Sequence, residues 1–155
     1  MAEKHAPTQL AQNKKARHYY ELLDFVEAGL ILTGPEVKSI RAGLASFHDA
    51  YVFFRQGEAY ARGLRISPYA NAGYAAQDPD RERKLLLHAA EIRSLSAKVE
   101  QKGLSIIPVN LHLRRGHIKM ELALARGKKM HDQRLSLKEA AELRDMQREI
   151  AGKYK

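Results

Sequence analysis

The sequence predicts a mainly β fold with helices, namely a closed antiparallel Greek-key barrel with helices at its rim and a C-terminal tail. Two observations carry this prediction. The apolar runs follow one another in the order strand, short helix, two strands, longer helix and two strands, which is the order that such a barrel requires. The chain has 155 residues, which suffices for one compact domain with a tail and not for two ordinary domains.

The first strand is predicted over residues 18–32, where aromatic and branched apolar residues are frequent. The segment Glu27-Ala28-Gly29 interrupts the apolar run, and we expect a bend or bulge there. Residues 1–16 are polar and lack apolar periodicity, so this segment is predicted to be unstructured by itself. After the strand, Thr33 offers an N-cap hydroxyl and Glu36 follows three residues later, which predicts a short helix with a capping box.

Two β-hairpins are predicted, and their strands span residues 50–54, 59–66, 104–113 and 117–125. Gly57 and Gly116 permit the positive φ that tight hairpin turns require. Pro108 lacks a backbone N–H, so we expect an edge or a bulge at that position. Both hairpins should pair antiparallel.

A second helix is predicted between the hairpins. Asp78-Pro79 has the form of an N-cap followed by proline at the first helical position, and Ile92, Leu95 and Val99 recur at helical spacing before Gly103. The complete order of elements predicts a barrel of the oligonucleotide/oligosaccharide-binding (OB) type.

Beyond the barrel, Ser136 and Glu139 form a capping-box pattern, and Leu143, Met146 and Ile150 form a thin apolar stripe. A helix of this length is marginal alone, so we expect a tail that is disordered by itself and helical when held. The alternative is a helix docked permanently on the barrel. The predicted division is a flexible basic N-terminal arm at 1–16, a barrel at 17–132 and a basic tail at 133–155.

The charge indicates a polyanionic partner. Twenty-seven Lys and Arg stand against eighteen Asp and Glu, which gives a net charge of +9. The chain has no cysteine and no long apolar run, so we expect no thiolate zinc site, no disulfide and no membrane span. We therefore expect a cytoplasmic protein, monomeric, without a metal or another cofactor.

No enzyme motif is complete. Gly127-Lys128-Lys129 has neither the upstream glycine nor the hydroxyl residue of a phosphate-binding loop. His112, His117 and His131 could transfer protons in a metal-independent nuclease, although solvated histidines are the commoner explanation. We therefore predict a binding protein, with a small nuclease as one alternative.

Several ordered blocks of sequence are more specific. They are Asn13-Lys14-Lys15-Ala16-Arg17-His18-Tyr19, Glu36-Val37-Lys38-Ser39-Ile40-Arg41-Ala42-Gly43, Asp49-Ala50-Tyr51-Val52, Arg83-Lys84-Leu85-Leu86-Leu87-His88, and Ala123-Leu124-Ala125-Arg126-Gly127-Lys128-Lys129. Through these blocks the chain resembles, from about Asn13 to Arg134, the family of SsrA-binding (tmRNA-binding) proteins of bacterial trans-translation. It departs from the family at Gln133, where the family usually has Lys, and its tail is similar only in length and charge.

The resemblance implies a barrel that binds the tRNA-like domain of tmRNA and delivers it to stalled ribosomes. It also implies a tail that occupies the empty decoding site and mRNA channel, against small-subunit rRNA. The implied RNA-binding residues are Asn13, Lys14, Lys15, Arg17, His18, Glu27, Lys38, Arg41, Lys84, Leu86, Gly127, Lys128 and Lys129. The implied ribosome-binding residues are His131, Asp132, Arg134, Lys138, Arg144, Arg148 and Lys153.

The chemistry of these residue types fits an RNA ligand. Cations meet phosphates, Asn13, His18 and Glu27 can form hydrogen bonds with bases or ribose, and Leu86 can cover a base. Each also has a structural explanation: Leu86 as core, and His18 as a histidine at a strand edge. The second function that we consider is a sequence-tolerant single-stranded RNA-binding OB protein, which would require aromatic rings exposed for base stacking.

Overall fold

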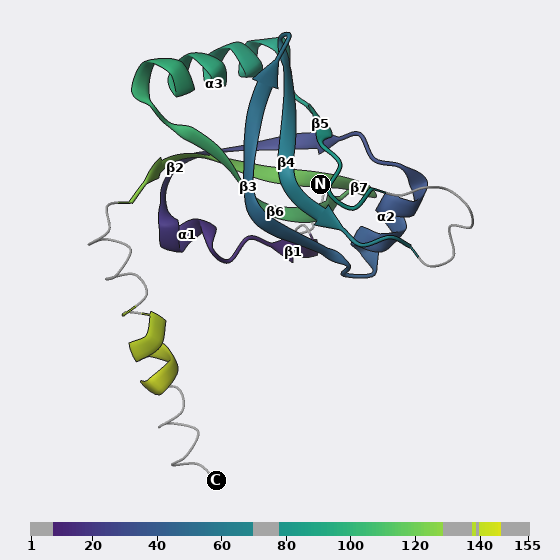
Figure 1. The fold of residues 1–155 in the computed structure, drawn as a ribbon, viewed down its shortest axis with the longest axis horizontal. Coiled ribbons are helices and arrows are strands. Elements are labelled where there is room, and N and C mark those ends of the chain that lie inside the picture. Colours follow the sequence, from purple (N-terminus) through teal and green to yellow (C-terminus); the bar gives the residue numbers. More distant parts are fainter. Residues whose placement is uncertain (1–7, 70–77, 129–137, 139, 147–155) are drawn as a thin grey trace, which may run out of the picture.

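A computed structural model describes residues 8–69, 78–128, 138 and 140–146 (Figure 1). The strands are β1 (Thr8–Gln12), β2 (Tyr20–Leu30), β3 (Ala45–Arg55), β4 (Glu58–Ile66), β5 (Arg83–Leu86), β6 (Ser105–Arg114) and β7 (His117–Gly127). The helices are α1 (Ala16–Tyr19), α2 (Gly34–Arg41) and α3 (Ala89–Lys102).

Six strands close into a barrel. Going round the sheet, β6, β3, β4, β5, β2 and β7 are neighbours, and β7 pairs again with β6. Every pairing is antiparallel, and β1 is added to β6 outside the ring. The predicted closed barrel is therefore confirmed.

The core follows from strand alternation. Met120 and Leu122 of β7 and Leu111 of β6 point inward and are fully buried. Ile40 of α2 and Ile92 of α3 add buried side chains from outside the sheet, and the two helices lie at different ends of the barrel (Figure 1). The closed sheet thus leaves alternate residues of each strand on its outer face.

The turns and one bulge agree with the sequence. Both hairpins turn through two residues of positive φ, Gln56 with Gly57 and Arg115 with Gly116, as tight hairpins require. The pairing of β6 with β7 shifts register just after Pro108, where the bulge was predicted. The capping box at Thr33 is also confirmed, since Glu36 N donates to Thr33 Oγ1 at 3.3 Å and Thr33 N donates to Glu36 Oε1 at 2.9 Å.

Gly63 of β4 lies opposite a second bulge, which shifts β3 between Phe47 and Tyr51. Its φ is +87°, and a Cβ there would lie 2.5 Å from the carbonyl oxygen of His48 and 2.6 Å from the Cα of Ala50. Only glycine fits this position, because another residue would clash with backbone that the bulge brings close.

Three local predictions were wrong at the N-terminal side. Residues 8–12 form β1 and are not unstructured, because β6 offers them a strand edge, with Thr8 opposite Leu113. His18 lies in α1 and does not open a strand. The irregularity of β2 falls between Leu22 and Asp24, whereas Glu27 to Gly29 pair regularly with β7.

The helix N-cap predicted at Asp78 was also wrong, although the second helix does end at Gly103 as predicted. Asp78 instead initiates a turn, with Asp80 N donating to Asp78 Oδ1 at 3.0 Å. Residues 83–86 form β5, which pairs with both β2 and β4. The helix begins only at Ala89, after His88, whose N–H donates to Glu91 Oε1 at 3.0 Å. Pairing with two neighbouring strands overrides the local signal here.

A buried ion pair joins α2 to β5. The guanidinium of Arg83 is fully buried and donates to Glu36 Oε2 through Nε at 2.9 Å and Nη2 at 2.8 Å. It also donates to the carbonyl oxygens of Leu64 at 2.5 Å and Pro79 at 3.2 Å. Burial raises the pKa of Glu36, but donors from Thr33, Arg81 and Arg83 outweigh it, and the pKa is lowered overall.

Removing the cation of this pair should lower the stability of the folded protein. Arg83→Met leaves the Glu36 carboxylate buried with fewer donors, so we expect the free energy of unfolding to fall by about 3–5 kcal/mol. The matched control is Arg65→Met, whose ion pair with Asp80 at 3.0 Å is half exposed on both sides; it should cost less than about 1 kcal/mol. Urea denaturation of both variants measures the difference, and equal losses would contradict the structural role of Arg83.

Acid should weaken the buried ion pair of Glu36 with Arg83. Because the pKa of Glu36 is lower in the folded than in the unfolded chain, its contribution is complete above the ordinary glutamate pKa of about 4.3 and is lost as pH falls through the lowered value. The Glu36→Gln variant should show a flatter fall of melting temperature in that acidic range than the unaltered protein. Parallel curves would show that Glu36 does not carry the acid sensitivity.

Candidate nucleic-acid interface

The outer face of β5, β2 and β7 carries a small surface that combines apolar, basic and acidic side chains. Gly29 of β2 pairs with Leu86 of β5 on one side and with Lys119 of β7 on the other. A Cβ on Gly29 would lie 3.1 Å from the Leu86 Cβ and 3.6 Å from the Lys119 Nζ, so the bare glycine lets both side chains cross the strand. Glu27 projects on the same face two residues away. We call these four residues the Leu86 surface.

Leu86 is exposed although its neighbour Leu85 is in the core. The exposed fractions are 52% for Leu86 and 1% for Leu85, as strand alternation requires. The structural explanation of Leu86 as a core residue is therefore wrong. An exposed leucine beside a lysine amine offers an apolar contact next to a cation.

Glu27 is held by two neighbours on β6. Its Oε2 accepts from Nε2 of His112 at 2.8 Å and from Nε of Arg114 at 2.8 Å. Burial raises the pKa of Glu27, but these two donors outweigh it, and the pKa is lowered overall. The side chain of Glu27 remains 35% exposed, so an ionised and oriented carboxylate faces the surroundings.

Three other predicted cations lie on elements that border this surface. Lys84 projects from the same face of β5 and forms an ion pair with Glu58 at 3.5 Å. Arg41, at the end of α2, donates to the carbonyl oxygen of Gly116 at 3.4 Å. Lys38 of α2 lies over the ring of Tyr69 at 5.5 Å. All three are at least partly exposed.

A second group of predicted residues gathers at the opposite end of β2. Lys14, Lys15 and Arg17 are exposed on and before α1. Lys128 joins them, because its N–H donates to the Tyr19 carbonyl oxygen and its Nζ donates to that of Arg17, both at 2.9 Å. We call α1, the residues 13–15 before it and the segment Gly127–Lys128 the α1 surface.

Asn13 and Ala16 fix the α1 surface to the barrel. Asn13 Nδ2 donates to the Pro108 carbonyl oxygen at 2.8 Å, at the bulge of β6. Ala16 is buried with Ile107 and Ala125 in a small apolar cluster separate from the main core. Asn13 therefore has a structural role that the sequence did not reveal.

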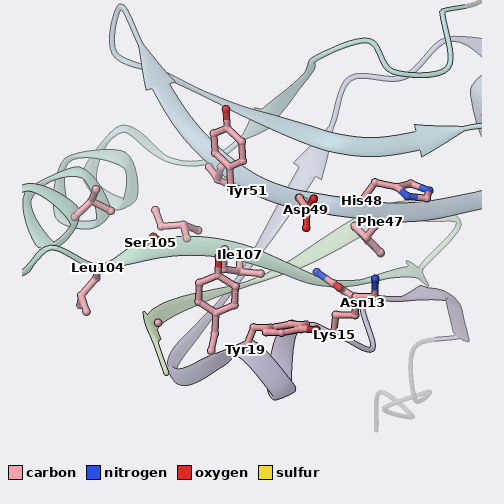
Figure 2. A pocket seen from close by; sticks show the side chains of 17 residues that line it. Asn13, Lys15, Tyr19, Phe47, His48, Asp49, Tyr51, Leu104, Ser105 and Ile107 are labelled. Atoms are coloured by element: carbon pink, nitrogen blue, oxygen red, sulfur yellow. The ribbon is translucent and has the colours of Figure 1, made fainter. Parts of the chain in front are cut away.

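A groove of about 640 Å³ runs beside the α1 surface (Figure 2). Figure 2 shows β3, with Tyr51 and Asp49, on one side and Asn13, Lys15 and Tyr19 on the other. Tyr19 and Tyr51 are 41% and 37% exposed. The groove exists because β3 pairs with β6 only at Val52 and Ile106, so the strands part on either side of that contact.

The predicted RNA-binding residues thus fall on two surfaces and not on one. β2 runs from the α1 surface at Tyr20 to the Leu86 surface at Gly29, which is about 30 Å of extended strand. Sequence reasoning missed Lys119, Arg114 and His112 as neighbours of Glu27 and Leu86. The alternation of β6 and β7 pointed these residues outward, but only the register brings them together.

The described residues of the tail, 138 and 140–146, are helical. Leu143 and Met146 are exposed by 56% and 59%. Lys138 forms an i, i+4 ion pair with Glu142 at 3.9 Å, and Arg144 Nε donates to the Ala140 carbonyl oxygen at 3.4 Å. The other predicted sites, Lys129, His131, Asp132, Arg134, Arg148 and Lys153, lie outside the described residues, as do Ser136, Glu139 and Ile150.

His112, one of the three histidines for which a solvated side chain was the commoner explanation, is buried. His112 is 4% exposed, and both of its ring nitrogens are engaged, one with Glu27 and one with Asn110. Neither nitrogen is open to move a proton on a substrate, which weakens the nuclease alternative. Within the described ranges no group of three or more His, Cys, Asp or Glu is arranged to hold a metal ion. The helices that the structure describes are too short or too polar to cross a membrane.

Comparisons with known proteins agree on one family. The family model described as SmpB protein matches residues 10–152. An SsrA-binding protein of Nitratidesulfovibrio vulgaris is 61% identical over 142 residues, and one of Lawsonia intracellularis is 57% identical over 143 residues. Each alignment covers 92% of this chain and 92% of the relative.

A solved structure has the same fold. It is described as "tmRNA-SmpB: a journey to the center of the bacterial ribosome", and it matches with a TM-score of 0.65 and 50% sequence identity. The match covers 77% of this chain and 84% of that chain. The family model and the relatives each span most of the chain, and the barrel agrees with both. The chain therefore belongs to the SmpB family.

Proposed function

We propose that this protein binds the tRNA-like domain of tmRNA through the Leu86 surface and brings it to stalled ribosomes for trans-translation. The observation that carries the proposal is the Leu86 surface itself, in which an exposed leucine, an amine and an oriented carboxylate lie on adjacent strands of an OB-type barrel. The relatives are named SsrA-binding proteins, and the similar solved structure is described as tmRNA with SmpB. The protein acts as a binding factor in the cytoplasm, where ribosomes work.

The Leu86 surface suits a folded RNA with unpaired loop bases. Leu86 offers an apolar contact to a base face, Lys119 meets a phosphate, and the Glu27 carboxylate accepts from a base amino group or a ribose hydroxyl. A phosphate backbone alone has no donor for Glu27. The surface therefore favours RNA whose bases or riboses are presented in a fixed geometry.

The α1 surface and the tail form a second contact region. Gly127 and Lys128 belong to the α1 surface and are the last described residues of the barrel before the tail in the sequence. We assign this region to the ribosome, where Lys14, Lys15 and Arg17 meet rRNA phosphates and the tail enters the empty decoding site and mRNA channel. This assignment divides the predicted RNA-binding residues between two partners. The division is needed because about 30 Å of strand separates the two surfaces.

One observation bears on the alternative of a sequence-tolerant single-strand binder. The outer face of the β3–β4 hairpin carries Phe53 stacked on Tyr60, with ring centroids 5.6 Å apart. Arg55 lies over Tyr60 at 4.6 Å and Arg62 over Phe53 at 5.1 Å. On this hairpin, the arginines of the protein itself therefore occupy ring faces that a general binder needs free for stacking.

Competition for RNA tests the function. A labelled tRNA-like domain of tmRNA bound to the protein should be displaced by the same unlabelled RNA and not by a single-stranded homopolymer at comparable concentration. An electrophoretic mobility assay at fixed salt measures this, since all such affinities depend on salt. Displacement by both competitors at similar concentration would favour the single-strand binder.

Two adjacent leucines provide a matched pair of variants. Leu86→Ala should weaken binding of the tRNA-like domain and leave the melting temperature nearly unchanged, because Leu86 is half exposed. Leu85→Ala should instead lower the free energy of unfolding by about 2–5 kcal/mol, as expected for a core leucine. Filter binding and urea denaturation of both proteins check the two effects. Loss of stability in Leu86→Ala without loss of binding would remove Leu86 from the interface.

Removing the tail should separate binding from rescue. Truncation after Arg134 keeps β7 and Lys128, and the large apolar side chains of the described part of the tail, Leu143 and Met146, are already exposed. We expect an unchanged melting temperature, a modest loss of tmRNA affinity and no tagging of stalled peptides in a reconstituted translation system. Tagging should fail because only the tail extends into the mRNA channel: about twenty residues in a helix extend roughly 30 Å. A large drop in melting temperature would show instead that the tail docks on the barrel.

A further inference from the structure

His112 is a buried histidine on the outer side of the barrel wall. Its Nδ1 faces Asn110 Oδ1 at 2.8 Å, and its Nε2 faces Glu27 Oε2 at 2.8 Å. Buried polar groups need partners, and here the partners also fix the protonation state of the ring.

The neighbour of Asn110 determines its orientation. Asn110 Nδ2 donates to Glu121 Oε2 at 3.2 Å. A carboxylate can only accept, so the amide nitrogen must face Glu121 and the amide oxygen must face His112. His112 Nδ1 must therefore carry a proton.

The protonation of the second ring nitrogen, Nε2, is deduced in the same way. Burial raises the pKa of Glu27, but the His112 and Arg114 donors outweigh it and lower the pKa overall, so at neutral pH Glu27 is a carboxylate that can only accept. His112 Nε2 must carry a proton too. With both nitrogens protonated, His112 is an imidazolium cation.

The surrounding charges fit this cation. Glu27 and Glu121 lie directly opposite each other on β2 and β7, an arrangement that repels without a cation nearby. The imidazolium contacts Glu27 directly and Glu121 through Asn110. Arg114 shares the Glu27 oxygen, Lys119 is opposite His112 on β7, and the residue opposite on β1 is the neutral Gln9.

We propose that His112 is a positioning residue for RNA binding: as a buried imidazolium it holds the Glu27 carboxylate by Oε2 and presents Oε1 to a donor of the RNA. Among the described residues both protein donors of Glu27 reach Oε2, which leaves Oε1 for the ligand. The inference rests on the proposed function, because it assumes that the Leu86 surface binds the tRNA-like domain.

A neutral side chain at position 112 would not hold Glu27 in this way. It would lack the positive charge between Glu27 and Glu121, so the two carboxylates would repel and Glu27 would keep only the Arg114 donor. Binding should therefore weaken when His112 is replaced, and the weakening should require Glu27.

The test combines single variants with the double variant. Binding of the tRNA-like domain is measured at pH 6.0, at one salt concentration, for the unaltered protein, His112→Gln, Glu27→Ala and the double variant. His112→Gln should bind about tenfold more weakly at pH 6.0, as for loss of a charge-assisted hydrogen bond. The double variant should bind no more weakly than Glu27→Ala, because the two residues act through one contact.

A second measurement does not depend on any variant folding. In the unaltered protein, ¹⁵N NMR of His112 at pH 6.0 should show protons on both ring nitrogens, and melting temperatures of the variants identify any loss from unfolding. A neutral ring at pH 6.0, additive losses in the double variant, or equal binding by the unaltered protein and His112→Gln would each overturn the inference. If the unaltered protein did not bind the tRNA-like domain, the proposed function would fall first, and this inference with it.

Discussion

The antiparallel pairing of β2 with β7 decides where every candidate RNA contact lies. These two strands pair over almost their whole length, from Tyr20 opposite Gly127 to Gly29 opposite Lys119. One end of the ladder anchors α1 and the departure of the tail, and the other end sets Gly29 between Leu86 and Lys119. A slip of β2 by one residue would turn Glu27 into the core and Ala28 out of it. The barrel therefore holds two surfaces at a fixed separation on a single rigid element.

How much the sequence predicts depends on whether a feature is local. The capping box at Thr33, the two tight turns and the bulge at Pro108 were predicted correctly, because the residues that cause them are adjacent in the chain. β1 and β5 were missed because their stability comes from strands far away in sequence, and a polar segment such as residues 8–12 has no pattern of its own. The candidate site was predicted residue by residue through a family resemblance. Its division into two surfaces, and the link from Glu27 to His112, required the register of the strands.

Net charge alone overstates how much of the barrel is available to an anion. Arg55 and Arg62 share Glu82, Arg65 pairs with Asp80, and Lys84 pairs with Glu58, so the cations on the β3–β4–β5 face are largely engaged with acids. Exposed pairs of this kind contribute little to stability, but they reduce the local positive potential. In the part of the chain that the structure describes, Lys14, Lys15 and Arg17 form no ion pair. These three cations therefore keep their positive charge at the α1 surface, whereas acids offset much of the positive charge on the β3–β4–β5 face.

The Leu86 surface works differently, because its own carboxylate, Glu27, and the neighbouring Glu121 lie where an RNA must approach. Glu27 and Glu121 would repel phosphates if they stood alone, and a purely electrostatic interface would exclude them. Here they are surrounded by Lys119, Arg114 and, on our inference, the His112 imidazolium, which leaves the cluster with three positive and two negative charges. The local charge is then positive enough to accept RNA, while the held carboxylate adds an acceptor that phosphate oxygens cannot satisfy. Only a ligand that brings an amino or hydroxyl donor to Glu27 recovers the cost of desolvating it. A carboxylate in a basic surface thereby favours a nucleic acid that presents an amino or hydroxyl donor at that point over a polyanion that offers phosphates alone, which a set of lysines cannot do.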